Sequence, residues 1–329
     1  MSKGKRITAI VFAGLFLVIA VFLLIWYLGD SYKQFYPIAT KEFKIAGLDD
    51  GFTPQGLCFN ESTNQFLMCG YMKNKSASRL YVINAETNET VKFFTLKTAD
   101  NKDYTGHAGG IATDGTSVWI VGDKTVNRFM FSAIETAENK GKIDIIDNFT
   151  TQNGADFVTI ENGNLWVGEF HKDGQYDTPA SHHVTAEGKT LKALHLCYKI
   201  NETKAFGLDS TTPTKAISAG SLQQGMVITD DKIIVSASYS VATSKLLVYD
   251  NVLNDPAPNT IDIDGTPVAH YILADSVNTK TIEAPSMSEE IALADNKVYI
   301  LFESAYQKYR LFTRERMKNI YSIPLTQFN

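Results

Sequence analysis

The run GHAGGIATDGTSVWIVGD at residues 106–123 decides the fold of this chain. It consists of a polar, glycine-rich segment, a short apolar strand, a turn at Asp114-Gly115 and a second strand that ends on a glycine and an acid. Short apolar strands joined by Asp, Asn or Gly turns predict β-hairpins. Related runs begin at Pro54, Gly154, Gln223 and Ser288, so the hairpin occurs five times in the chain.

Repetition of one hairpin at a spacing of roughly 40–70 residues is typical of a β-propeller. A blade has four strands, and the repeat that starts at Ser288 supplies three before the sequence ends. The lone strand at residues 42–46 is therefore expected to complete that last blade and close the ring. The sequence predicts an all-β propeller of five blades, or of six if residues 259–282 form a degenerate blade from the runs TIDID and HYILA.

Two segments interrupt the repeat. In the second blade, the outer strand is expected near residues 143–148, after a segment at 132–139 that favours at most a turn or two of helix. In the third blade, a long excursion at residues 170–189 separates the second strand from the third. Both segments are expected to lie outside the regular blade pattern.

An apolar segment precedes the propeller. Residues 7–28 (ITAIVFAGLFLVIAVFLLIWYL) carry no charge and reach the ~20 residues that a bilayer-spanning helix needs. Lys3, Lys5 and Arg6 precede it, which predicts an N-terminus in the cytoplasm. We expect a single-pass protein of the cell membrane with a basic cytoplasmic tail at 1–6, a transmembrane anchor at 7–29, a tether at 30–40 and the propeller outside at 41–329. A cleaved signal peptide is the alternative, although its apolar core usually has only about 7–15 residues.

The part of the chain after the anchor is acidic. The whole chain has a formal net charge of −5, and the first 29 residues contribute +3, which leaves −8 for the remainder. An acidic domain without a basic stripe argues against a nucleic-acid partner. The three cysteines, Cys58, Cys69 and Cys197, cannot all pair within the chain, and we expect buried free thiols.

The propeller repeat gathers residues that are far apart in sequence at one mouth of the central channel. Inner strands line the axis, and an antiparallel hairpin starts and ends on the same side. Loops at such a rim carry function on a rigid scaffold. The positions before the inner strands and after the second strands are Gln55, Tyr71, His107, Asp123, Asp156, Glu169, His171, Gln224, Tyr239, Glu289, Glu290 and Glu303.

Nine of these positions form the expected ligand-binding set: Gln55, His107, Asp156, Glu169, His171, Gln224, Tyr239, Glu289 and Glu303. Four carboxylates within it, Asp156, Glu169, Glu289 and Glu303, are oxygen ligands of the kind that Ca²⁺ prefers. His107 or His171 would then act as a general base on a substrate or water polarised by the metal. The plain alternative is a hydrated channel mouth that is polar without a catalytic purpose.

Other candidates carry weaker patterns. His182 and His183 in the excursion are neighbours that point apart on a strand, with no ligand spacing around them. His195 and His270 lie inside strand-like runs and are expected in the core or on the surface. The basic and aromatic loop at residues 306–310 follows Glu303 at the same rim, and either contacts an anionic or sugar ligand or is simply solvated.

The runs at residues 285–309, 224–240 and 106–120 resemble a group of secreted or membrane-anchored bacterial β-propellers that has no assigned reaction. More loosely, the layout is similar to calcium-dependent propeller hydrolases of the gluconolactonase and paraoxonase group. That second resemblance implies an axial Ca²⁺ held by acids and Asn side chains. The present chain departs from it by offering Gln and His at several of the corresponding places.

Three functions follow as hypotheses. The first is a membrane-anchored extracytoplasmic propeller that binds a small molecule, a glycan or a protein at its polar, acidic rim. The second is a calcium-dependent hydrolase, lactonase- or esterase-like, that uses the same rim. The third is a structural interaction module without a small-molecule site.

Overall fold

The computed structural model describes residues 11–21, 32–309 and 313–329. Residues 11–21 are α-helical and carry exposed apolar side chains. The rest of the anchor predicted at 7–29, and the predicted tail at 1–6, lie outside the described residues. Within the described ranges, no helix combines the length and the apolar character needed to cross a membrane.

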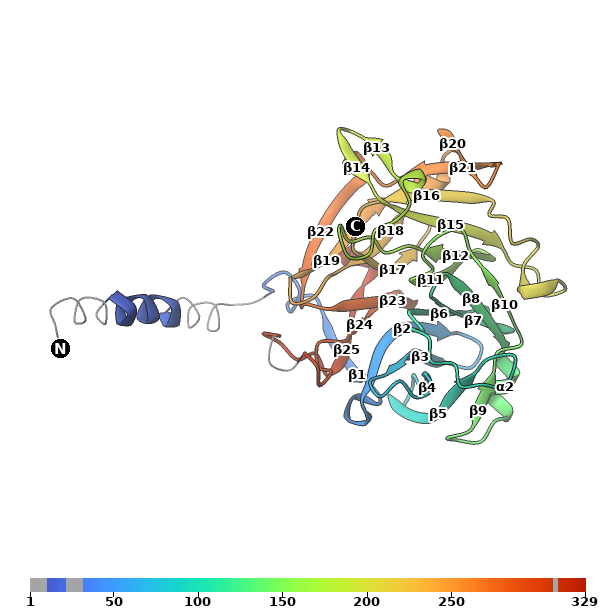
Figure 1. Cartoon of the computed structure of the whole chain (residues 1–329), viewed down its shortest axis with the longest axis horizontal. Helices are drawn as coiled ribbons and strands as arrows, with labels where there is room; N and C mark the ends of the chain where they lie inside the picture. Colours follow the sequence, from blue (N-terminus) through green and yellow to red (C-terminus); the bar gives the residue numbers. More distant parts are fainter. Residues whose placement is uncertain (1–10, 22–31, 310–312) are drawn as a thin grey trace. The chain divides into compact units, whose positions relative to one another are not determined.

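The compact unit that begins at Gln34 is an all-β propeller of five blades, as predicted. Figure 1 shows the five inner strands gathered at the centre of the ring. Each inner strand contacts the inner strands of the neighbouring blades. They are β2 (Phe52–Asn60), β6 (Gly110–Thr113), β11 (Phe157–Glu161), β17 (Gln223–Ile228) and β23 (Ser288–Ala294).

The remaining strands of each blade follow outward by antiparallel pairing. Blade one adds β3 (Gln65–Met72), β4 (Arg79–Asn84) and β5 (Glu89–Lys97), and blade two adds β7 (Ser117–Gly122), β8 (Thr125–Met130) and β10 (Asp147–Thr150). Blade three adds β12 (Asn164–Gly168), β15 (Ala193–Lys199) and β16 (Lys215–Ala219), and blade four adds β18 (Lys232–Ala237), β19 (Ser244–Asp250) and β22 (Asn278–Ala284). Blade five adds β24 (Lys297–Phe302), β25 (Asn319–Pro324) and the N-terminal β1 (Thr40–Lys44).

The ring closes as the sequence predicts. Strand β1 runs antiparallel to β25, with Thr40 opposite Ser322 and Lys44 opposite Asn319. The compact unit nevertheless starts earlier than the predicted boundary at residue 41. Phe35 is fully buried and packs against Phe302, so part of the predicted tether at 30–40 belongs to the propeller.

The segment at residues 259–282 does not form a sixth blade. Strands β20 (Asn259–Ile263) and β21 (Thr266–Ile272) make a hairpin around Asp264-Gly265, both with positive φ, as a two-residue turn of this kind requires. Strand β21 pairs in parallel with β16, so the hairpin extends the outer edge of blade three. Ile263 and Val268 enter the apolar cluster between blades two and three, which explains why the hairpin stays there.

The outer strand expected near residues 143–148 is divided between two blades, which corrects the prediction. Strand β9 (Lys142–Asp144) runs parallel to β5 and extends blade one, whereas β10 completes blade two. The short helix α2 (Phe131–Thr136) precedes β9 and buries Phe131 and Ile134.

The hydrophobic core fills the spaces between adjacent blades. Strand β7 shows the pattern, because Val118 and Ile120 pack toward blade one while Trp119 and Val121 pack toward blade three. Both faces of a central strand are therefore buried, and the strand is apolar throughout rather than alternating. All three cysteines are free, as predicted. Cys69 and Cys197 are buried as expected, whereas Cys58, which pairs with Leu67 in the ladder, is only half-buried.

Glu290 joins the blades at the axis. Its side chain is 1% exposed and accepts backbone N–H bonds from Leu57 at 2.7 Å, Ile111 at 2.9 Å and Val158 at 2.9 Å. One carboxyl group from blade five therefore bonds the inner strands of blades one, two and three. A Cβ at Gly110 would lie 2.6 Å from the Glu290 carboxyl and 2.7 Å from the backbone of Phe157 and of Val158, and this backbone cannot give way.

The excursion in blade three has its own structure. It contains a 3-10 turn at Ala180–His182 and a separate hairpin of β13 (Val184–Ala186) and β14 (Lys189–Leu191). The other 3-10 turns are Leu48–Asp50, Ala205–Gly207, Val252–Asn254, Asp275–Val277 and Leu325–Gln327.

Candidate functional site

Three of the inner strands begin with a β-bulge, and the residues in these bulges lie at the mouth of the central channel. The ladder register shifts between Pro54 and Gly56, between Gln223 and Gly225, and between Ser288 and Ile291. A bulge places an extra residue in one strand and redirects its side chain, and such bulges are common at rims and near active sites. The residues held in these three bulges are Gln55, Gln224, Glu289 and Glu290.

A group of side chains from blades one, two and five, which we call the mouth cluster, meets at this rim: Gln55, Tyr71, His107, Glu289, Glu303, Tyr306 and Tyr309. His107 donates from Nε2 to Gln55 Oε1 at 2.6 Å, and Gln55 Nε2 donates to Glu303 at 3.2 Å. The Tyr71 ring stacks on the His107 ring with 4.9 Å between centroids. The amide of Gln55 thus links the imidazole to the carboxyl.

Glu289 and Glu303 form an interacting carboxyl pair at the centre of this cluster. Glu289 is 3% exposed, and burial together with the charge of Glu303 raises its pKa well above the ordinary value. Burial raises the pKa of the partly exposed Glu303 to about 7, against the lowering influence of Lys308. Two carboxyls in contact cannot both ionise cheaply, so the pair holds a proton near neutral pH.

This pair predicts a specific pH dependence of stability. The folded-state pKa of Glu303 lies above its unfolded value of about 4.5, so the folded protein binds the extra proton. Its contribution is fully present below about pH 4.5 and is lost as the pH rises through about 7. We expect wild type to lose about 1–3 kcal/mol more of its unfolding free energy between pH 5 and pH 8 than the Glu303→Gln variant does. Urea unfolding at each pH measures this, with the exposed Glu283→Gln as control, and equal slopes for all three proteins would contradict it.

A second group lies in blade three. The backbone N–H of Phe170 donates to Asp156 Oδ2 at 2.7 Å, and burial raises the pKa of Asp156 to about 7, with a further contribution from Glu169. Glu169 is 2% exposed and contacts His182 Nδ1 at 3.0 Å and 3.1 Å through its two oxygens. The backbone N–H of Leu194 also donates to Glu169, at 3.1 Å. Asp156 and Glu169 are therefore a second acid pair, held by its own partners.

The four carboxylates expected to bind Ca²⁺ thus lie in two pairs with separate hydrogen-bond partners. Among the described residues, none of these four acids belongs to a cluster of three possible metal-ligand atoms. Such a cluster is formed instead by His171, Asp173 and Asp177, whose ligand atoms lie within 4.8 Å of one another. Asp173 is engaged by Lys192 and by His171, and these contacts lower its pKa to about 2.

The other predicted residues occupy the edge of the mouth. Tyr239 lies beside Phe170, with 6.3 Å between ring centroids, and its hydroxyl donates to Gln175. Gln224 is half-buried in its bulge. The structure therefore brings together Gln55, His107, Glu289 and Glu303, groups Asp156 with Glu169, and leaves His171 and Tyr239 in neighbouring loops of the same rim.

Two histidines have roles that the sequence did not indicate. His182 is 7% exposed because the excursion folds back and brings its ring to Glu169. His195, expected in the core or on the surface, is fully buried; it accepts the N–H of Glu169 and contacts Gln223 Oε1 at 2.6 Å. Burial lowers the pKa of His195 to about 4, so the ring is neutral. The excursion starts directly after the second strand of blade three, which ends next to Glu169. This position in the sequence was the one signal that could have placed His182 near Glu169.

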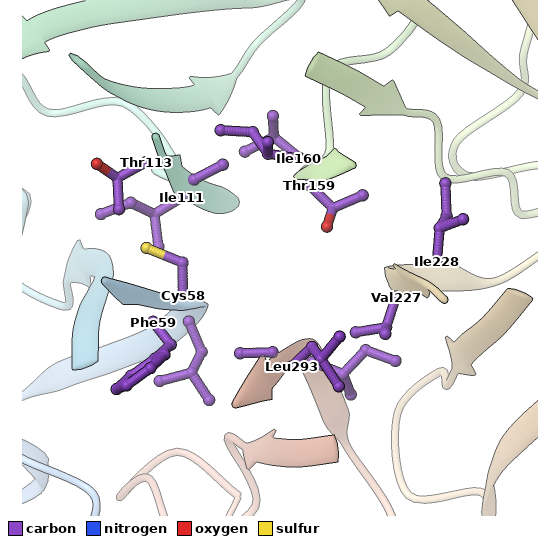
Figure 2. Close-up of a pocket in the computed structure, with 14 residues that line it drawn as sticks. Cys58, Phe59, Ile111, Thr113, Thr159, Ile160, Val227, Ile228 and Leu293 are labelled. Carbon is purple, nitrogen blue, oxygen red and sulfur yellow. The ribbon is translucent and has the colours of Figure 1, made fainter. Parts of the chain in front are cut away.

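The opposite end of the axis is different in character. The later halves of the inner strands enclose a cavity of about 100 Å³. Figure 2 shows that most of the side chains around it are apolar, among them Cys58, Ile111, Ile160, Val227 and Leu293. Residues 57, 111 and 158, which line this cavity, also donate their backbone N–H groups to Glu290.

No family model matches the chain, and no curated protein matches it. Among solved structures, the tail fibre of Staphylococcus aureus phage P68 aligns over 88% of this chain and 53% of that chain, with 9% identity and a TM-score of 0.50. A glutaminyl cyclase of Myxococcus xanthus aligns over 87% of this chain and 95% of that chain, with 12% identity and a TM-score of 0.46. A luciferin-regenerating enzyme covers the same shares, with 10% identity and a TM-score of 0.44. At these identities the likeness concerns the fold alone.

Proposed function

We propose that this chain is a membrane-anchored propeller that binds a small polar ligand at the mouth cluster. The observation that carries the proposal is the Glu289–Glu303 carboxyl pair at a partly open rim. Burying two acids side by side destabilises a fold unless a proton, a cation or a ligand relieves the repulsion. Perturbed titratable groups in such positions concentrate at functional sites.

The surrounding side chains support a binding role. Gln55 offers an amide, His107 an imidazole, and Tyr309 a phenol that interacts with Glu303. These groups come from three blades, so the ring fixes their spacing before a ligand arrives. A carboxyl pair that loses a proton near neutral pH can also exchange that proton with a bound group.

A ligand screen tests this proposal. The full chain in detergent is mixed at about 1 mM with a panel of amines, amino acids, sugars and carboxylates, and its unfolding is followed. A ligand at tenfold excess over its Kd stabilises the folded state by about 1.4 kcal/mol. We expect stabilising compounds whose effect is lost in Glu303→Gln and kept in the exposed control Glu283→Gln. If no compound separates the two variants, the mouth is not the binding site.

The calcium-dependent hydrolase is the second candidate, because carboxylate pairs at a rim suit a divalent cation. It requires Asp156, Glu169, Glu289 and Glu303 to rearrange into one ligand set. A Ca²⁺ titration into the same preparation distinguishes the two candidates. A rise in melting temperature that disappears in Glu289→Gln would favour the hydrolase, and an unchanged melting temperature would favour the plain ligand-binding mouth.

We further propose that residues 7–29 anchor the chain in the cell membrane with the propeller outside the cytoplasm. The uncharged run and the preceding Lys3, Lys5 and Arg6 support this topology. Protease added to intact cells or spheroplasts is expected to remove a C-terminal tag. A tag that resists protease until the cells are lysed would contradict the orientation.

A further inference from the structure

The mouth cluster already accommodates one ammonium group, that of Lys308. The Lys308 Nζ lies 5.1 Å from the centroid of the Tyr309 ring, which is cation–π distance. Its charge also acts on Glu303, where it opposes the effect of burial on the pKa. Lys308 is exposed, so its ammonium lies over the Tyr309 ring from the solvent side and is not fixed in the core.

Tyrosine rings surround the two acids. Tyr71 and Tyr309 are half-buried, and burial followed by the charge of Glu303 raises the pKa of each phenol, so both remain neutral. Tyr306 is 2% exposed and meets the Tyr309 ring edge to face, with 5.9 Å between centroids. Neutral aromatic faces next to carboxylates form the chemical surroundings that recognise organic cations.

The same surroundings suit a hard metal ion less well. Ca²⁺ takes about 6–8 oxygen ligands. The mouth cluster presents two carboxyls and one amide, and Gln55 already uses that amide to bond His107 and Glu303. Aromatic rings occupy much of the remaining perimeter. The formal charge of −8 after the first 29 residues also attracts a cationic ligand over a neutral or anionic one.

We propose that the ligand of the mouth cluster is an organic ammonium ion, whose charge lies between the Glu289–Glu303 pair and the faces of Tyr71 and Tyr309. This inference rests on the proposed function and names the chemical class of its ligand. The ammonium of Lys308 is then a resident competitor that the ligand displaces. Primary and quaternary ammonium ions share this chemistry, and the experiment separates them.

Binding is coupled to proton release. An incoming positive charge favours the doubly ionised carboxyl pair, so the proton held between Glu289 and Glu303 leaves to solvent. The charged and titratable groups that face the pair are Lys308, Tyr71, Tyr309 and the neighbouring Glu290, whose charge adds to the rise in the pKa of Glu289. Tyr306 lies behind Tyr309, and His107 lies behind Gln55. Because Glu303 titrates at about pH 7, affinity should rise between pH 6 and pH 8.

The test uses the full chain in detergent and isothermal titration calorimetry. The probes are choline and its neutral isostere 3,3-dimethylbutan-1-ol, and ethanolamine as the primary ammonium with ethylene glycol as its neutral counterpart. We expect at least one ammonium to bind about tenfold more tightly than its neutral counterpart, with proton release into the buffer and tighter binding at pH 8 than at pH 6. Ammonium ions that bind no better than the neutral compounds would overturn the inference.

Three variants locate the ion. Tyr71→Phe keeps the aromatic face and should retain binding, whereas Tyr71→Leu removes it and should weaken binding about three- to tenfold. Lys308→Met removes the competing ammonium and should strengthen binding, and a loss of affinity in this variant would contradict the displacement. If the screen instead yields neutral or anionic ligands that depend on Glu303, the ammonium inference fails while the proposed function stands. If no ligand depends on Glu303, both fail.

Discussion

Replacement of Glu290 by glutamine is expected to lower the free energy of unfolding by about 2–4 kcal/mol, and replacement by alanine to prevent accumulation of folded protein. The carboxyl accepts three backbone N–H bonds from three different blades, at 2.7–2.9 Å. Glutamine keeps one acceptor oxygen but turns an NH₂ group toward a backbone donor. Alanine leaves all three donors buried without an acceptor, at about 1–3 kcal/mol each.

The free energy lost in these Glu290 variants is large compared with the total stability of a folded domain. A folded domain is stable by only about 5–15 kcal/mol, so the alanine variant loses a large fraction of that margin. Chemical unfolding of Glu290→Gln and soluble expression of Glu290→Ala measure the two effects, with Glu283→Gln as an exposed control of the same chemistry. Wild-type stability in Glu290→Gln would show that the axis is held by strand packing alone.

Deletion of residues 1–46 is expected to destabilise the propeller enough to cause aggregation, whereas deletion of residues 1–31 is not. The longer deletion removes β1 and exposes the edge of β25. It also removes Phe43, which is 3% exposed and packs on Phe66 of blade one, 5.0 Å between centroids, and on Tyr299 of blade five. Strand β1 therefore connects the last blade to the first.

A point variant isolates the packing part of this effect. Phe43→Ala keeps the β1–β25 ladder and should cost about 3–5 kcal/mol through the cavity that it leaves. The melting temperature and the fraction of soluble protein are measured for the two deletions and for Phe43→Ala. If the two deletions melt at the same temperature, the N-terminal strand does not close the ring.

Local sequence was sufficient for the blade pattern. Each hairpin carries its own turn signal, such as Asn162-Gly163 with φ of 46° and 69°, and its own apolar strands. A strand that joins the outer edge of a blade in parallel has no turn connecting it to its partner, because that partner lies far away in the sequence. The local sequence therefore does not indicate which blade such a strand joins. For this reason the short strand Lys142–Asp144 and the hairpin of β20 and β21 could not be assigned to blades one and three in advance.

The candidate site shows the same division. The repeat placed Gln55, His107, Glu289 and Glu303 at one rim, since a hairpin begins and ends on the same side, and the structure joins them in one cluster. Which side chains of the rim interact with each other depended on the directions in which they point, and the repeat does not specify these directions. His182 reached Glu169 only because the excursion folds back over blade three.

The neighbours Glu289 and Glu290 show most directly what sequence and tertiary structure each determined. The sequence by itself determined that an acidic pair begins the last inner strand, and hence that it lies at the mouth of the channel. Only the tertiary structure decided that Glu289 pairs with Glu303 while Glu290 bonds the backbones of three other blades. The physical reason is the bulge between Ser288 and Ile291, which breaks the strict alternation of a strand and gives adjacent identical residues different surroundings.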